Sequence, residues 1–148
     1  MISPEMLRRH PYFAGVSDQS LKEIAMIAEE KRVPAGTRMF GEGDPANCLY
    51  VISKGEVNID YLLGTGEMRT VDTLVDGDLL VWSSLIEPYK TTAIGTTTKD
   101  CDLLCIDAPR LRALCEKDPL LGYRLSNQVA KLLAHRLEGA RVQLAAVD

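Results

Sequence analysis

Apolar residues recur every three or four positions near both ends of the chain, as in helices, and in short alternating runs in the middle. The segment SDQSLKEIAMIAEE places apolar residues every three or four positions after Ser17, a residue type favoured at helix N-caps. We therefore expect helices over 3–9 and 17–30, so that N-terminal helices occupy 1–32.

From 33 to 107 short apolar runs alternate with polar residues and with glycine turns. The runs LYVIS and VNIDYLL, the Gly-rich tip LGTGE and the turn DGD predict short strands joined by tight turns. Many short strands at close spacing favour a β-roll or jelly-roll barrel. The fold class we expect is α+β, with 1–148 forming a single domain.

The helical period returns over 108–148. Pro109 lies in the first turn of a short helix, and Pro119 begins a long one. An apolar stripe follows one face of this long helix: Val129, Leu133, Leu137, Ala140, Leu144 and Val147. A stripe of this length favours a dimerisation helix that pairs with a second copy, and packing against the chain's own roll is the alternative.

Composition narrows the function classes. The 148 residues contain 46% hydrophobic and 26% charged residues, as a globular domain does, and the formal net charge is −4. This charge gives no field that would attract nucleic acid, so we expect no DNA binding by this chain alone. The sequence holds no signal peptide or membrane span, so we expect a cytoplasmic location and no membrane contact.

The spacing of two cysteines, four positions apart, raises the question of a metal site, but the geometry of a strand argues against one. Cys101 and Cys105 lie on a predicted strand, where positions four apart are separated by about 13 Å. A single zinc ion would have to lie about 2.3 Å from each of the two sulfurs. We therefore expect buried thiols rather than a metal site.

Five segments in one order carry a family resemblance. They are YFAGVSDQSLKEIA, VPAGTRMFGEGD, LYVISKGEV, LVDGDLL and RLSNQVAKLLAHRLE. With them the chain resembles the cyclic-nucleotide-binding domains of the Crp/Fnr (catabolite activator) regulators over nearly its whole length. Regulators of this type carry a helix-turn-helix domain after the long helix, and the 148 residues hold none; the sequence leaves open whether they come from a longer regulator.

The resemblance also implies a phosphate-binding cassette over 77–93, with a short helix, and here the sequence departs from the family. Gly77 keeps the entry turn, and Ser83 and Ser84 begin the short helix. Leu80 stands at the position where the family has an aromatic residue, Val81 at the position of its Gly, and Trp82 at the position of its Glu. The return strand keeps Thr92, but Thr91 stands where the family has an Arg that binds the phosphate. Both charged ligand contacts are therefore missing.

Three further side chains keep the ligand question open. Lys90 either swings toward a bound anion or is a solvated lysine. Trp82 either fills the pocket or stacks on a flat ligand. Arg136 matches a family position that reaches the base, or is solvated at the surface.

We therefore expect a sensory module that couples a small anionic ligand, such as a cyclic nucleotide, to its C-terminal helix. The alternative is a ligand-free dimerisation module whose pocket Trp82 plugs. The motifs of catalytic sites are absent from the sequence, so we expect no enzymatic activity. We expect a homodimer, a protein partner that reads the signal, and no metal.

Overall fold

The computed structural model describes residues 1–147. Its elements in chain order are α1 (Pro4–Arg8), η1 (Pro11–Phe13), α2 (Asp18–Met26), β1 (Ala28–Val33), β2 (Arg38–Phe40), β3 (Cys48–Lys54), β4 (Val57–Leu62), β5 (Met68–Leu74), β6 (Leu79–Leu80), η2 (Trp82–Leu85), β7 (Ile94–Thr97), β8 (Cys101–Asp107), α3 (Ala108–Lys117) and α4 (Pro119–Ala145). The predicted fold class, a β-roll with N-terminal helices and a long C-terminal helix, is confirmed.

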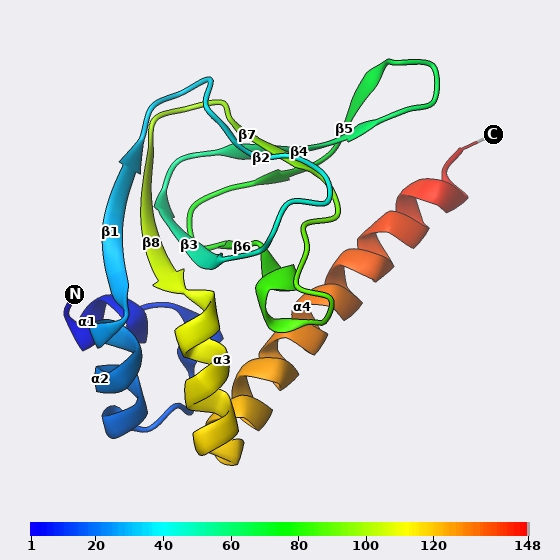
Figure 1. The fold of residues 1–148 in the computed structure, drawn as a ribbon. Helices are drawn as coiled ribbons and strands as arrows, with labels where there is room; N and C mark the ends of the chain where they lie inside the picture. The colour runs from blue at the N-terminus through cyan, green and yellow to red at the C-terminus, as the bar shows by residue number, and fades with distance from the viewer. Residues whose placement is uncertain (148) are drawn as a thin grey trace.

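Two antiparallel sheets form the roll. One has the strand order β1-β8-β3-β6 and the other β2-β7-β4-β5. The helices gather at one end of the roll, and α4 runs diagonally away from them toward the side on which the β4–β5 hairpin projects (Figure 1). This arrangement leaves the C-terminal half of α4 facing the second sheet.

Strand β8 separates two apolar cores. Leu104 and Ile106 point into the core shared with the helices, whereas Cys101 and Leu103 point into the core between the sheets. Because both of its faces are buried, this strand is apolar almost throughout rather than alternating.

The helix caps follow the predicted chemistry. The Ser17 side chain accepts a hydrogen bond from the N–H of Ser20 and begins α2. Asp107 and Asp118 cap α3 and α4 in the same way, each followed by a proline within the first two helical positions.

The predicted end of the second helix is wrong. The helix ends at Met26, and Ala28–Val33 pair instead with β8, so the roll begins before residue 33. The charged run Glu29–Arg32 favours a helix by local propensity. In the structure it forms an edge strand with exposed charges, a composition that protects a sheet edge from pairing with other chains.

Residues 1–147 contain neither a membrane-spanning helix nor a cluster of metal-binding side chains. None of the helices described there is long and apolar enough to span a bilayer. Nor does this part of the chain bring together three or more His, Cys, Asp or Glu side chains that could hold a metal ion.

Candidate functional site

The turn that enters the cassette is fixed by backbone hydrogen bonds. Gly77 has a φ of 89°, a conformation that glycine adopts without steric cost, and its N–H donates to the carbonyl of Ile52 at 2.6 Å. The Ile52 N–H in turn donates to the carbonyl of Asp78 at 3.0 Å. The turn is thereby attached to the end of β3.

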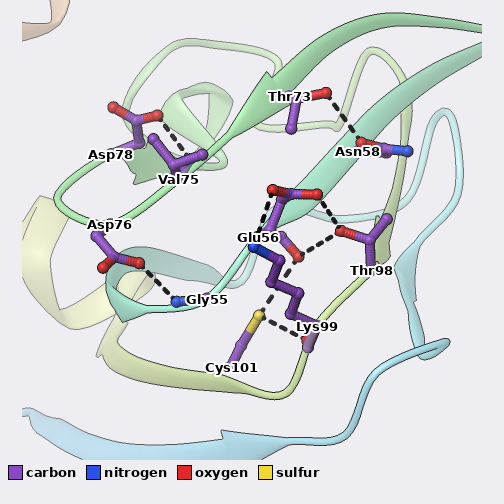
Figure 2. A network of polar contacts seen from close by, with 10 residues as sticks. All are labelled: Gly55, Glu56, Asn58, Thr73, Val75, Asp76, Asp78, Thr98, Lys99 and Cys101. Atoms are coloured by element: carbon purple, nitrogen blue, oxygen red, sulfur yellow. Dashed lines mark hydrogen bonds and ion pairs between the residues drawn. The ribbon is translucent and has the colours of Figure 1, made fainter.

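A polar network braces this turn from behind (Figure 2). The Asp76 carboxylate accepts from the Gly55 N–H at 2.7 Å, and the Asp78 carboxylate accepts from the Val75 N–H at 2.8 Å. Gly55 has a φ of 132°, and a Cβ at this residue would lie 2.8 Å from the Cα of Cys101. Only glycine therefore fits where the two turns meet.

The short helix of the cassette is one 3₁₀ turn of four residues, η2. Val81 precedes it with a φ of 67°, so a β-branched residue has the left-handed conformation at the position where the resemblance places glycine. Such a conformation costs about 1–3 kcal/mol and persists only when the surroundings impose it. Here Val81 is buried in the core between the sheets, which holds it in place.

A cavity of about 820 Å³ lies between the roll and α4. Its walls come from β4, β5, the cassette, the residues before β7, and α4. They include Ile59, Tyr61, Asp72, Leu80, Val81, Trp82, Ser83, Thr91, Thr92, Leu133, Arg136 and Leu137. A volume of this size is within the ~300–1,000 Å³ typical of small-molecule sites.

Trp82 is part of the cavity wall and does not fill the cavity. Its side chain is partly buried and packs against the core that the roll shares with the helices. The alternative of a plugged pocket is therefore not supported, because the cavity stays open beside the indole.

Thr91, at the position of the missing arginine, has a structural contact instead. Its hydroxyl donates to the carbonyl of Gly41 at 2.5 Å and accepts from the N–H of Asp44 at 3.0 Å. The residue is 6% exposed. Thr91 therefore holds the loop between β2 and β3 against the cassette, while Thr92 is exposed and lines the cavity.

Three predicted site residues lie outside the cavity wall. Lys90 is exposed and forms a backbone bridge with Pro45, and it is not among the described residues that line the cavity. Of the two alternatives for Lys90, this placement favours the solvated lysine. Gly77 and Ser84 are likewise not among the described lining residues: Gly77 shapes the turn, and the Ser84 carbonyl accepts from Arg112 at 2.6 Å.

Arg136 crosses the cavity to the opposite sheet. Its guanidinium forms an ion pair and hydrogen bond with the Asp72 carboxylate on β5, and both residues line the cavity. The side chain is 25% exposed, so Arg136 is not simply solvated. Nothing in the sequence indicated that Asp72 belongs to the site, because it occupies an ordinary polar position on a strand. Only the fold brings it close to α4.

The apolar stripe of α4 divides into two parts. Val129 is 3% exposed in the chain's own core, so it is not available to a second copy, and Leu133 is half-buried. Leu137, Leu144 and Val147 line the cavity but keep 59%, 73% and 72% of their surface exposed. The predicted dimer seam can therefore begin only beyond Leu133.

A roll with a glycine-turn cassette, and a cavity bordered by a long C-terminal helix, is the architecture of cyclic nucleotide-binding-like regulatory domains. The family model of the cyclic nucleotide-binding domain matches residues 30–118, and the chain belongs to this family.

Known proteins resemble the chain over most of its length. A putative cyclic nucleotide-binding protein from Geobacter metallireducens is 39% identical, with a TM-score of 0.84 over 93% of this chain and 99% of that one. The cyclic AMP receptor protein of Thermus thermophilus is 27% identical over 93% of this chain, and a CRP-like cAMP-activated global transcriptional regulator of Mycobacterium tuberculosis is 26% identical over 95%. The chain spans 62% and 61% of these two relatives.

Replacing Thr91 by valine tests the structural contact of that residue. Thr91→Val keeps the shape but leaves the Asp44 N–H and the Gly41 carbonyl without this partner, so we expect a loss of about 1–3 kcal/mol in the free energy of unfolding, measured by urea denaturation. The control Thr92→Val, at an exposed neighbour, changes stability little. Equal stability of both variants and the wild type would show that the Thr91 contacts do not hold the loop.

Proposed function

We propose that this cyclic nucleotide-binding-like regulatory domain senses a small anionic ligand, a cyclic nucleotide, in the cavity between its roll and α4. The observation that carries the proposal is that the cassette region and α4 both contribute residues to the cavity wall. Trp82 and Thr92 come from the cassette region, and Leu133 and Arg136 come from α4. A ligand in this cavity touches both elements at once, so its binding energy depends on where α4 lies.

The lining chemistry suits a molecule with a flat ring and one negative charge. The Arg136 guanidinium can form charge-assisted hydrogen bonds to an oxyanion. The Trp82 indole offers a flat face for stacking, and the hydroxyls of Ser83 and Thr92 can donate to phosphate or ribose oxygens. The names of the Thermus and Mycobacterium relatives, which mention cyclic AMP, support the same ligand class.

The divergent cassette predicts weaker binding than the family pattern would give. Two charged contacts are missing, and a hydrogen bond to a charged group contributes about 1.5–3 kcal/mol. The loss corresponds to roughly two to four decades in affinity. Arg136, which approaches the cavity from α4, is the described cation best placed to recover part of it.

The pair between Arg136 and Asp72 supplies a means of coupling. We infer that Arg136 exchanges Asp72 for the ligand anion, so that the contact between α4 and β5 is lost. A partly exposed ion pair contributes about 0.2–1 kcal/mol. A charge-assisted bond to the ligand, at about 1.5–3 kcal/mol, exceeds this value. Ligand binding is therefore expected to release α4 from the hairpin.

Substitution of Asp72 tests this exchange of partners. Asp72→Asn removes the carboxylate that competes for Arg136, so we expect the affinity for cyclic AMP or cyclic GMP to rise about two- to fivefold. Calorimetry measures the affinity, and the emission of Trp82, the one tryptophan of the chain, reports entry into the cavity.

Glu67→Gln is the matched control. It removes the same charge from the same hairpin, at an exposed residue that is not among the described lining residues. If neither nucleotide produces heat or a change in emission at millimolar concentration, nucleotide sensing is wrong. If Asp72→Asn and Glu67→Gln bind the nucleotide with equal affinity, the exchange of partners by Arg136 is ruled out, but nucleotide sensing is not.

We also propose a homodimer, and the exposed part of the α4 stripe supports it. Leu137, Leu144 and Val147 border the cavity and remain largely exposed, so a second copy's α4 laid along them would cover both the apolar surface and the open side of the cavity.

A pair of charge substitutions on α4 tests this dimer. Leu144→Glu places a charge on the stripe and is expected to convert dimers into monomers in sedimentation velocity at micromolar concentration. Val142→Glu makes the same kind of change at an exposed residue that is not part of the stripe, and is expected to leave the dimer intact. A wild-type protein that sediments as a monomer contradicts the proposal.

A further inference from the structure

Two thiols far apart in the sequence meet on neighbouring strands. Cys48 is the first residue of β3, Cys105 lies in β8, and 57 positions separate them. The Cys105 S–H donates to the Cys48 sulfur at 3.2 Å. The sequence directs attention to Cys101 and Cys105, whereas the fold gives Cys105 a different neighbour.

The geometry is close to that of a disulfide. The register pairs Cys48 with Asp107 and Tyr50 with Cys105, so the two cysteines are diagonal neighbours. Diagonal pairs usually have Cα atoms about 7–8 Å apart, slightly beyond the roughly 6.8 Å that a disulfide spans, so the two strands must move a little closer for the bond to form. The 3.2 Å sulfur contact means that the side chains are already within reach, and a bond of about 2.05 Å requires only a small further approach.

The two thiols differ in ionisation and access. The hydrogen bond from Cys105 lowers the pKa of Cys48 to about 6, with smaller contributions from Tyr50 and the Lys31 charge, against burial and Asp107. The same contact, together with burial and the Glu29 charge, raises the pKa of Cys105, and the Lys31 charge opposes this rise. Cys48 is half-buried, whereas Cys105 is 6% exposed. The contact therefore favours the thiolate at the more accessible sulfur, that of Cys48, and the protonated thiol at Cys105.

The other two cysteines lack this arrangement. Burial raises the pKa of Cys101 and of Cys115. The Cys101 S–H lies against the carbonyls of Glu56 and Lys99, at 3.5 and 3.3 Å (Figure 2). Because thiolates and not thiols react with oxidants, these two serve as internal controls.

We propose that Cys48 and Cys105 form a reversible, oxidant-sensitive disulfide site. With a peroxide, the Cys48 thiolate attacks one oxygen, the O–O bond breaks, and the leaving hydroxide takes a proton to become water. The Cys105 sulfur then displaces the hydroxyl of the Cys48 sulfenic acid, which departs with the Cys105 proton as a second water. Two electrons pass from the two sulfurs to the peroxide, and an added dithiol reverses the reaction by thiol–disulfide exchange.

The bond would join β3 to the strand that leads directly into the C-terminal helices. Cys105 lies two residues before Asp107, which caps α3. The Ala108 N–H, at the start of α3, donates to the carbonyl of Asn47, beside Cys48. A cross-link here closes a long loop of the unfolded chain, so the oxidised protein should melt at a higher temperature. This site is separate from the ligand cavity and does not depend on the proposed ligand.

Thiol counting and peptide mapping of the whole chain test the proposal. After one equivalent of hydrogen peroxide at pH 7, we expect two of the four thiols to disappear, a Cys48–Cys105 cross-linked peptide, a melting temperature several degrees higher, and full reversal by dithiothreitol. Cys115→Ser is expected to behave like the wild type in forming the cross-link. In Cys105→Ala the alkylation of Cys48 by iodoacetamide should require higher pH, because the hydrogen bond that stabilises the thiolate is gone.

The wild-type peptide map decides the matter even if a variant fails to fold. A cross-link between another pair of cysteines, a cross-link between two chains, or four thiols remaining after the oxidant would each overturn the proposal.

Discussion

The packing of the first half of α4 determines the geometry of the rest of the site. Leu121, Leu125 and Val129 are buried among the N-terminal helices and the first sheet, so this end of the helix is fixed to the roll. Within the described residues, the part of α4 beyond Leu133 has no comparable apolar support, and the ion pair of Arg136 with Asp72 joins it to the roll. One end is thus held by burial, and the other by an interaction of about 1 kcal/mol or less.

This difference in strength makes the cavity a suitable place for regulation. A change at the free end of α4 disturbs little of the core, so the proposed ligand would move it at small cost. The opposite wall is firm: the turn at Gly77, which leads into this wall, is fixed to β3, and Thr91 ties the loop between β2 and β3 to the cassette. Val81, in a strained left-handed conformation, is held in the same wall by its burial. A rigid cassette facing a weakly held helix supports the proposal that a ligand in the cavity acts on α4.

Local signals in the sequence predicted the fold well. Ser17, Pro109 and Pro119 mark helix starts because capping and proline geometry depend on adjacent residues alone. The prediction that the second helix continues to residue 30 was wrong, because pairing with β8, a distant strand, outweighs the local helix propensity. The contacts of Thr91 with Gly41, Arg136 with Asp72 and Cys48 with Cys105 could not be predicted, since each joins positions far apart in the chain. The family resemblance located the cassette but could not show which of its side chains face the cavity.

The central claim is that one ligand contacts the cassette and α4 together. Amide hydrogen exchange with and without saturating cyclic AMP tests it most directly, because both walls are read in one experiment. The account predicts that exchange slows in the cassette, residues 77–93, and changes at the same ligand concentration in α4 from 133 to 145. A change confined to the cassette, or no change in either segment, would contradict it.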